Sequence, residues 1–476
     1  MAARRVSQGY MPYRDFAFTQ APLFPYVFQF AQPLIKTFGL AGGRLVNVGF
    51  SLLTFFLLLR SLRYFTPERS RRFATLLLIC LLGLNVFQAQ YTVTVKTYPL
   101  AAFFLSLGVL GWLSYHQTRR LRTLMLCALA LAAATATRLS LGLFFIPLGF
   151  ALLGQRKSEG EKAWISFGVT GLLGLSLFFL PFLLLAPEGF KFGLLDFHAA
   201  RQVDSTLLLK AGFLSRVTQS YFPALLIFAL LLFRWKSWQP GLRTLAIGMG
   251  AVTLLHLLAP FPYDDYQVAL YPVWVLLIAI ESAHQLPASK QIQIAPLLLA
   301  SCLLFAFSSA QLPRWFSNGQ DRIWIKTKSQ SDLSLLREKS KWLHQTFTQP
   351  LKEILTMDTY LAIESDLEIP VGLEMGPFSY FPDMETEKAE HLRVLNLKRG
   401  MELIRHSNAD IATFSGYTFA IETPWITQTP LKVRQMIFDL MMEKFTPITN
   451  IENFGQGPTT LLILAHPKLN QRTHPY

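Results

Sequence analysis

Cysteine is one of the scarcest residues in this sequence of 476 residues, with three copies. Cys80, Cys127 and Cys302 all lie in apolar runs, and the polar C-terminal part has none. A framework of disulfides is therefore excluded, and cysteine usage does not indicate a redox compartment. The sequence also lacks the internal repeats from which many membrane transporters are built.

Acidic residues are scarce in the first two-thirds of the chain. Residues 1–312 hold 10 Asp and Glu against 26 Lys and Arg, whereas residues 313–476 hold 19 against 18. The formal net charge of +15 therefore belongs to the part that is richest in apolar residues. Cations in the loops of such a part set membrane topology and contact anionic lipid. This distribution argues against a nucleic-acid-binding face.

Long apolar segments are the main positive feature. Hydrophobic residues make up 52% of the sequence, which contains 40 Phe and has a mean hydropathy of +0.34. Many of the apolar runs approach the ~20 residues that span a bilayer as a helix. We therefore predict a polytopic α-helical membrane protein with about ten transmembrane helices. The predicted spans are 41–59, 73–90, 99–115, 123–137, 139–154, 163–185, 218–233, 244–260, 267–285 and 292–312.

The loops between these spans alternate in charge. One set holds 15 Lys and Arg, and the opposite set holds 6. Because loops rich in Lys and Arg stay in the cytoplasm, the first set is predicted to be cytoplasmic. The segment around Asp15, the loops at 91–98 and 186–217, the turn at 262–266 and the C-terminal part then lie outside. We expect a multi-pass protein of the plasma (inner) membrane.

From about Pro313 the composition becomes polar, and the apolar residues follow shorter patterns. These patterns predict helices and strands in alternation, which is typical of a small α/β domain. The predicted helices are 331–347, 385–406 and 430–445, and the predicted strands are 351–357, 410–415 and 459–465. We expect a soluble α/β domain on the outer side of the membrane.

The stretch from Gly9 to Tyr26 reads GYMPYRDFAFTQAPLFPY and contains a single acid, Asp15, next to Arg14. From the residues alone, this carboxylate is either solvated at the membrane surface and paired with Arg14, or active in catalysis. The motif G-Y-M-P-Y-R-D-F followed by Q-A-P-L-F-P-Y resembles the first external loop of the GT-C superfamily of membrane glycosyltransferases. It is similar in particular to the bacterial branch of protein mannosyltransferases and lipid A aminoarabinose transferases.

The resemblance implies a GT-C-like fold, a donor sugar linked to a polyprenyl phosphate, and Asp15 as the catalytic base. It makes residues 1–40 an external catalytic loop with an interfacial helix, residues 41–312 the transmembrane helical domain and residues 313–476 the extracytoplasmic α/β domain. It also implies a transmembrane helix before the catalytic loop, which this sequence does not contain. We therefore expect Met1 to be internal to the natural chain.

Two cations lie at the ends of predicted spans. Lys96 lies in YTVTVKTYPL, and the resemblance implies that polar residues of this loop help to hold the lipid phosphate. The alternative is that the lysine side chain only extends to the lipid headgroups. Arg138, in TATRLSLGLFF, lies between two short apolar runs with no acid nearby in sequence. Because a charge at that depth is costly without a partner, Arg138 is expected either to bind an anionic lipid phosphate or to be exposed in a short external turn.

The 186–217 loop contains FHAAR, in which His198 and Arg201 are three residues apart and would share one face of a helix. Together with Arg14, they are predicted to contribute to the site that binds the donor phosphate. The alternative is a structural histidine in a loop whose arginine is neutralised by the acids Asp196 and Asp204.

Two adjacent acids, Asp264 and Asp265, lie in PYDDYQVALYP, a turn bounded by prolines. They are predicted to contact hydroxyls of the donor sugar or, together with Asp15, a divalent cation; the alternative is a solvated turn between helices. No cofactor is certain, and a divalent cation is the candidate. His256, inside an apolar run, is predicted to be a buried structural histidine.

These features together predict an inverting glycosyltransferase that acts on the outer face of the membrane. Asp15 would deprotonate an acceptor hydroxyl of a lipid, glycan or protein, and Lys96, Arg138 and Arg201 would stabilise the leaving phosphate. The alternative is a membrane transporter, or a flippase or ligase of lipid-linked saccharides. The missing repeats, and charges gathered at helix ends on one side, favour surface chemistry over a translocation path.

Overall fold

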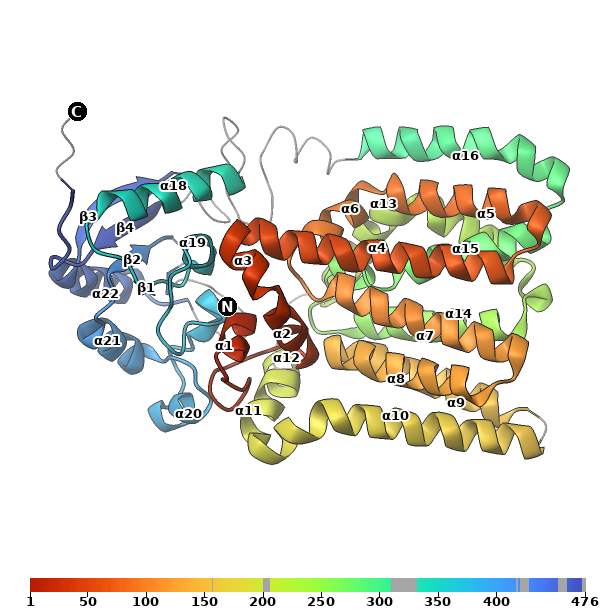
Figure 1. The fold of residues 1–476 in the computed structure, drawn as a ribbon, viewed down its shortest axis with the longest axis horizontal. Coiled ribbons are helices and arrows are strands. Elements are labelled where there is room, and N and C mark those ends of the chain that lie inside the picture. The colour runs from red at the N-terminus through yellow and green to blue at the C-terminus, as the bar shows by residue number, and fades with distance from the viewer. Residues whose placement is uncertain are drawn as a thin grey trace.

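The computed structural model describes residues 1–155, 157–199, 206–309, 332–416, 418–419, 428–452 and 460–472. A bundle of long helices occupies one end of the molecule and a smaller α/β domain occupies the other (Figure 1). The N-terminal segment lies between these two parts, together with the short helices that follow α10 (Lys157–Leu185). The N-terminal segment and the C-terminal domain therefore lie at the same end of the bundle (Figure 1).

Six described helices are long and apolar enough to cross a membrane, in agreement with a polytopic helical membrane protein. A seventh candidate is the bent pair Glu68–Gly83 and Val86–Val93, whose parts meet at 72°. Asn85 accounts for the break, because its side chain caps the second part by accepting a hydrogen bond from Gln88 N at 2.8 Å. The six are α4 (Leu40–Phe65), α7 (Tyr98–Thr118), α10, α13 (Thr206–Leu232), α14 (Pro240–Leu258) and α16 (Ala288–Ser308).

Shorter elements complete the bundle, so that each of the ten predicted spans contains a helix. The bent pair supplies the second span, and α15 at the centre of the bundle supplies the ninth. The shorter elements are η2 (Glu68–Ser70), α5 (Arg71–Leu78), η3 (Ile79–Gly83), α6 (Val86–Val93), α8 (Leu121–Thr137), η4 (Leu139–Phe144), α9 (Phe145–Leu153), η6 (Trp235–Ser237), η7 (Asp264–Gln267) and α15 (Tyr271–Gln285).

Burial differs strongly between central and peripheral helices. In α15 every residue from Tyr271 to Ala283 is buried except Trp274, and the helix packs against α4, α5, α7 and α13. Helices α10 and α16 instead expose large apolar side chains such as Leu184 and Leu304. Contiguous exposed apolar surface of this kind is the face that lipid chains cover.

The N-terminal segment is attached to the C-terminal domain by two buried arginines. Arg4 Nη1 donates to Leu367 O at 2.9 Å and its guanidinium pairs with Asp366. Arg5 Nε donates to Glu374 Oε1 at 2.9 Å. The segment consists of α1 (Ala2–Ser7), α2 (Leu23–Phe28), η1 (Gln29–Ala31) and α3 (Gln32–Phe38), and α2 packs against α8.

The C-terminal domain also caps the first long helix of the bundle. Glu364 Oε2 accepts a hydrogen bond from Leu40 N, the first residue of α4, at 2.8 Å. Gly39, with φ of +59°, permits this approach, because a Cβ there would clash with the Glu364 carboxylate. A carboxylate at a helix N-terminus also interacts favourably with the helix dipole.

The segment 186–217 differs from its prediction as a loop. Residues 206–217 are the first part of α13, and residues 187–199 form α11 (Pro187–Lys191), η5 (Phe192–Asp196) and α12 (Phe197–Ala199). The polar residues Lys210 and Arg216 interrupt the apolar pattern, although Leu207–Leu209 and Leu214 favour a helix. The prediction from the apolar pattern therefore placed the start of this helix at residue 218, whereas α13 begins at Thr206.

The C-terminal domain is a four-stranded sheet with helices packed on it, as predicted for an α/β domain. The strand order is β1-β2-β4-β3; β1 is parallel to β2, and the other two pairs are antiparallel. Its strands are β1 (Ile354–Leu355), β2 (Ile411–Phe414), β3 (Thr446–Ile451) and β4 (Leu461–Ala465). Its helices are α18 (Asp332–Thr346), α19 (Thr359–Glu364), η8 (Gly376–Ser379), α20 (Thr386–His391), α21 (Leu397–His406) and α22 (Leu431–Lys444).

Several parts of this domain differ from the prediction. Helices α19 and η8 were not predicted. The single helix predicted over 385–406 is divided into α20 and α21, because Arg393 has φ of +58° and Asn396 caps α21 by accepting a hydrogen bond from Arg399 N at 2.9 Å. Strand β3 was not predicted, since its exposed and half-buried residues do not follow a clean alternation. Arg393, at the break, becomes important for the candidate site.

Candidate functional site

Asp15 lies in a tight loop between α1 and α2, here called the Asp15 loop (residues 8–22). Tyr13 has φ of +70°, which is unusual for a bulky residue. The backbone is closed by hydrogen bonds from Tyr13 N to Phe16 O and from Asp15 N to Met11 O, both at 2.9 Å. Backbone strain of this kind persists only where surrounding structure enforces it, and it is frequent at functional sites.

The Asp15 carboxylate accepts three hydrogen bonds. Arg14 donates from Nε to Oδ1 at 2.9 Å and from Nη2 to Oδ2 at 2.8 Å, and Met11 N donates to Oδ2 at 2.7 Å. The bonds from Arg14 contribute most to lowering the pKa of Asp15 below its usual value. With 24% of the side chain exposed, Asp15 is an ionised carboxylate that a ligand can reach.

Aromatic rings and the short helices after α10 hold the Asp15 loop in place. Tyr13 is 2% exposed, and its ring makes edge contacts with Phe182 and Phe190. A Cβ at Gly193 would clash with the Phe18 carbonyl, so this close approach requires glycine. His198 Nε2 donates to Thr19 O at 2.8 Å, so His198 supports the backbone of the loop.

Lys96 and Asp265 meet although 169 positions separate them. Lys96 Nζ lies 2.8 Å from Asp265 Oδ2, and the ammonium lies 5.4 Å from the centre of the Tyr98 ring. The Asp265 side chain is 6% exposed, whereas that of Lys96 is 35% exposed. The ion pair therefore orients a lysine that keeps access to its surroundings.

Arg138 lies beside this pair, between two tyrosines. Its guanidinium carbon is 4.3 Å from the centre of the Tyr98 ring and 5.2 Å from that of Tyr266, and Nη1 donates to Thr97 Oγ1 at 3.1 Å. Within the described part of the chain, Arg138 has no carboxylate partner. Stacking on aromatic faces leaves guanidinium N–H groups available to an anion.

Asp264 is adjacent to Asp265 in the sequence, but its side chain faces a different cation. Its Oδ1 is 3.9 Å from Arg216 Nε, and 23% of its side chain is exposed. Burial, and then the neighbouring Asp265 charge, raise the pKa of Asp264. The structure thus gathers Lys96, Arg138, Asp264 and Asp265, here called the cation cluster, at the ends of α6, α8 and α14.

The remaining predicted residues are not part of the cation cluster. Arg14 and Asp15 form their own pair, and His198 supports the Asp15 loop. Arg201 lies outside the described residues. His256 is buried as predicted, with Ser140 Oγ 2.9 Å from Nε2 and Gln267 Nε2 3.1 Å from Nδ1.

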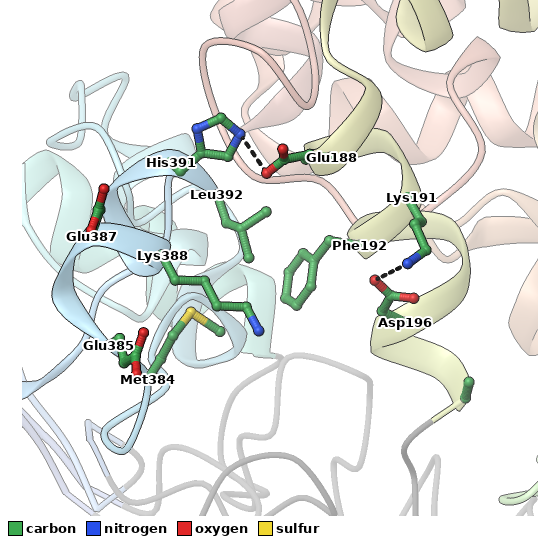
Figure 2. A pocket seen from close by; sticks show the side chains of 11 residues that line it. Glu188, Lys191, Phe192, Asp196, Met384, Glu385, Glu387, Lys388, His391 and Leu392 are labelled. Atoms are coloured by element: carbon green, nitrogen blue, oxygen red, sulfur yellow. Dashed lines mark ion pairs between the residues drawn. The ribbon is translucent and has the colours of Figure 1, made fainter.

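A cleft of about 910 Å³ opens beside the Asp15 loop, between α11, η5 and α20. Figure 2 shows two ion pairs in it, His391 with Glu188 at 2.9 Å and Lys191 with Asp196 at 3.7 Å. Phe192 lines the cleft and belongs to one buried apolar cluster with Ala17 of the Asp15 loop. No group of three or more His, Cys, Asp or Glu side chains positioned for a metal ion occurs in the described ranges.

The sequence interpretation missed the aromatic and long-range partners of these residues. Tyr98 and Tyr266 flank Arg138, and Arg393 Nε donates to Arg14 O at 3.1 Å. The tyrosines had a weak signal, because YPL and DDY place aromatic residues beside the predicted charges. Arg393 had none, since it follows an ordinary helical pattern.

Two known structures of ArnT have the same fold as this chain. No protein-family profile matches the chain, and no curated protein matches it in sequence. ArnT from Cupriavidus metallidurans bound to undecaprenyl phosphate superposes with a TM-score of 0.64 at 13% identity, covering 98% of this chain and 92% of ArnT. Its apo state gives 0.63 at 14% identity, covering 98% and 91%. AglB from Archaeoglobus fulgidus, with an inhibitory peptide and a dolichol-phosphate, gives 0.48 at 10% identity, covering 87% and 64%.

Proposed function

We propose that this chain, which has the fold of the GT-C membrane glycosyltransferases, transfers a sugar from a polyprenyl-phosphate donor to an acceptor hydroxyl. The observation that carries the proposal is that Asp15 is ionised and accessible in a strained loop. This loop lies at the same end of the bundle as the cation cluster (Figure 1). The ArnT structure that shares the fold contains undecaprenyl phosphate, a ligand of the proposed class.

In the proposed reaction, Asp15 is the general base. A carboxylate oxygen of Asp15 takes the proton of the acceptor hydroxyl. The hydroxyl oxygen attacks the anomeric carbon at the same time, on the side opposite the phosphate. The bond from the anomeric carbon to the phosphate oxygen breaks, so the configuration inverts. The pKa of Asp15 is lowered from its usual value, mainly by Arg14, so the carboxylate is ionised at neutral pH and well below it, as a base must be before transfer.

The leaving polyprenyl phosphate requires positive charge more than a proton. Lys96 and Arg138 are the proposed ligands of this phosphate, because both are cations supported by tyrosine rings at the end of the bundle. Asp265 orients Lys96 through the 2.8 Å ion pair. Asp264 is proposed to contact hydroxyls of the donor sugar.

The proposed reaction takes place on the outer face of the plasma membrane, where the C-terminal domain is extracytoplasmic. The acceptor is a lipid, a glycan or a protein. The charge difference between the two sets of loops supports this orientation. The packing of the C-terminal domain on the N-terminal segment supports placing Asp15 and this domain on the same side.

Replacement of the base tests the proposal. Asp15→Asn should lower transfer from radiolabelled polyprenyl-phosphate monosaccharides by about 10²- to 10⁴-fold, because the amide cannot accept the proton. Asp196→Asn, an exposed acid paired with Lys191, is the control and should retain transfer. Full activity of purified, folded Asp15→Asn would overturn the assignment of the base.

Thiol labelling tests the orientation. The three native cysteines are buried, so Asp15→Cys should be the main site that reacts with a membrane-impermeant reagent. Labelling of intact cells would support an external Asp15 loop. Labelling that requires permeabilisation would reverse the orientation and exclude transfer on the outer face.

A further inference from the structure

Arg393 belongs to the C-terminal domain but reaches the Asp15 loop. It lies between α20 and α21, where its φ of +58° turns the chain. Its neighbours Leu392 and Val394 are 5% and 0% exposed and pack in a cluster with Ala17 of the Asp15 loop. The backbone at Arg393 is therefore anchored on both sides while its own side chain is exposed.

The Arg393 side chain contacts the peptide that carries the base. Its Nε donates to Arg14 O at 3.1 Å, across 379 positions of sequence. In the described part of the chain, no carboxylate forms an ion pair with Arg393. The guanidinium is thus committed to the Asp15 loop rather than to an acid of its own domain.

Strained backbone gathers at the same junction. Five described non-glycine residues have positive φ, and three of them lie where the N-terminal segment meets the C-terminal domain. These three are Tyr13 in the Asp15 loop, Asp366 at the Arg4 ion pair, and Arg393. Conformations that cost free energy persist where other contacts enforce them, and they are concentrated at sites that need fixed geometry.

We infer that Arg393 is a positioning residue, by which the C-terminal domain fixes the Arg14–Asp15 peptide for proton abstraction. This inference rests on the proposed function of Asp15. Arg393 acts through the loop and does not itself touch the reacting atoms. It gives the C-terminal domain a defined part in the reaction at Asp15.

The charge of Arg393 also acts on Asp15. Arg14 and Met11 N are the hydrogen-bond donors that face the carboxylate, and Arg393 and Tyr26 are its other charged or titratable neighbours. The cation of Arg393 contributes to lowering the pKa of Asp15. Removal of that cation should therefore raise the pKa, so that activity is lost at a higher pH as the solution is acidified.

Three variants of the full chain test the inference. Arg393→Met keeps the length of the side chain but removes the donor and the charge, Arg393→Lys keeps the charge and one donor group, and Lys398→Gln removes an exposed cation of α21 as a control. We expect Arg393→Met to lower kcat about 10-fold with less than a twofold change in the KM for the donor. Arg393→Lys should recover most of this loss, and Lys398→Gln should resemble the unaltered protein.

Two further readouts separate positioning from a general loss of folding. The acid limb of the kcat/KM profile should move to higher pH in Arg393→Met but not in Arg393→Lys. Trypsin should cleave after Arg14 faster in Arg393→Met, because the Arg14 carbonyl loses its hydrogen bond, and the fragment that begins at Asp15 reports this by mass spectrometry. Unchanged kcat, pH profile and cleavage in Arg393→Met would overturn the inference.

The same experiments distinguish this inference from the proposed function. If Asp15→Asn is fully active, the assignment of Asp15 fails, and the inference about proton abstraction fails with it, even when cleavage after Arg14 still depends on Arg393. If Asp15→Asn is inactive while Arg393→Met matches the Lys398→Gln control in every readout, the proposed function stands and the inference about Arg393 alone is overturned.

Discussion

The junction with the C-terminal domain and the cation cluster hold their cations in different ways. At the junction, Arg4 and Arg5 are 5% and 6% exposed, and carboxylates and carbonyls of the C-terminal domain occupy their guanidinium groups. In the cation cluster, Arg138 lies on two tyrosine rings, and the described residues give it no carboxylate. A neutralised cation stabilises the fold, whereas a cation on aromatic rings retains capacity for an anion.

Lys96 combines both arrangements. It forms an ion pair with a nearly buried acid, as the arginines of the junction do, but a third of its side chain is exposed and it lies on a tyrosine ring, as Arg138 does. The difference teaches that exposure and the nature of the partner, rather than the presence of a charge, separate structural cations from candidates for phosphate binding. Four experiments can break or sharpen this distinction.

The largest effect is expected for Arg5→Met. Loss of the guanidinium leaves Glu374, whose side chain is 2% exposed, as an uncompensated buried charge, and we expect the free energy of unfolding to fall by about 3–5 kcal/mol. Chemical unfolding of the purified protein in detergent measures this change. Lys432→Met, at an exposed position of α22, is the control. Equal stability of the two variants would mean that Arg5 does not stabilise the fold.

Arg138→Gln should act on binding instead of stability. We expect the Kd for polyprenyl phosphate to rise about 10- to 100-fold, because hydrogen bonds with a charged group contribute about 1.5–3 kcal/mol. Titration with polyprenyl phosphate in detergent measures this, alongside the unfolding midpoint. Arg122→Gln, at the opposite end of α8, should change neither quantity. Destabilisation without weaker binding would place Arg138 with the structural arginines.

Asp265→Asn should have a smaller effect. Lys96 keeps its charge and its tyrosine rings but loses the oriented ion pair, so the Kd for polyprenyl phosphate should rise about two- to tenfold, corresponding to roughly 0.5–1.5 kcal/mol. Asp196→Asn serves as the matched control, since its lysine pair is exposed. Tighter binding in Asp265→Asn would mean that the acid competes with the phosphate for Lys96.

The smallest effect is expected from pH. The pKa of Asp15 is lowered from the usual value of 3.8, so its contribution to stability is present above that pH and is lost as pH falls through the lower folded value. Its ionisation should therefore impose no acid limb on kcat/KM above about pH 5. An acid limb of kcat/KM above about pH 5 that disappears in Asp264→Asn would instead identify Asp264 as the essential carboxylate. The pKa of Asp264 is raised, so its ionisation would give such a limb.

Local sequence predicted a large part of this protein. Apolar runs located a helix in each of the ten predicted spans, and composition separated the bundle from the α/β domain. The prediction failed where a local pattern continued through a change in structure. The helix predicted over 385–406 contains Arg393, whose left-handed backbone is enforced by packing against another part of the chain.

The candidate site follows the same division. Arg14 and Asp15 are adjacent, so their pairing could be proposed from the sequence, and the structure contains it. The pairing of Lys96 with Asp265 links residues 169 positions apart, and the contact of Arg393 with Arg14 links residues 379 positions apart. No local pattern encodes such contacts, because they depend on which helix ends and loops the fold brings together.

The sequence by itself determined that the chain enters a membrane, where its apolar runs lie and which short motif carries Asp15, because hydrophobic periodicity and adjacency are local properties. The tertiary structure decided which charges are neutralised and which keep access to a ligand. Arg5 and Arg138 are both arginines beside apolar residues in the sequence, and only folding places one against a buried carboxylate and the other against two tyrosine rings. The physical reason is that burial and pairing depend on distances between segments, which the order of residues leaves open.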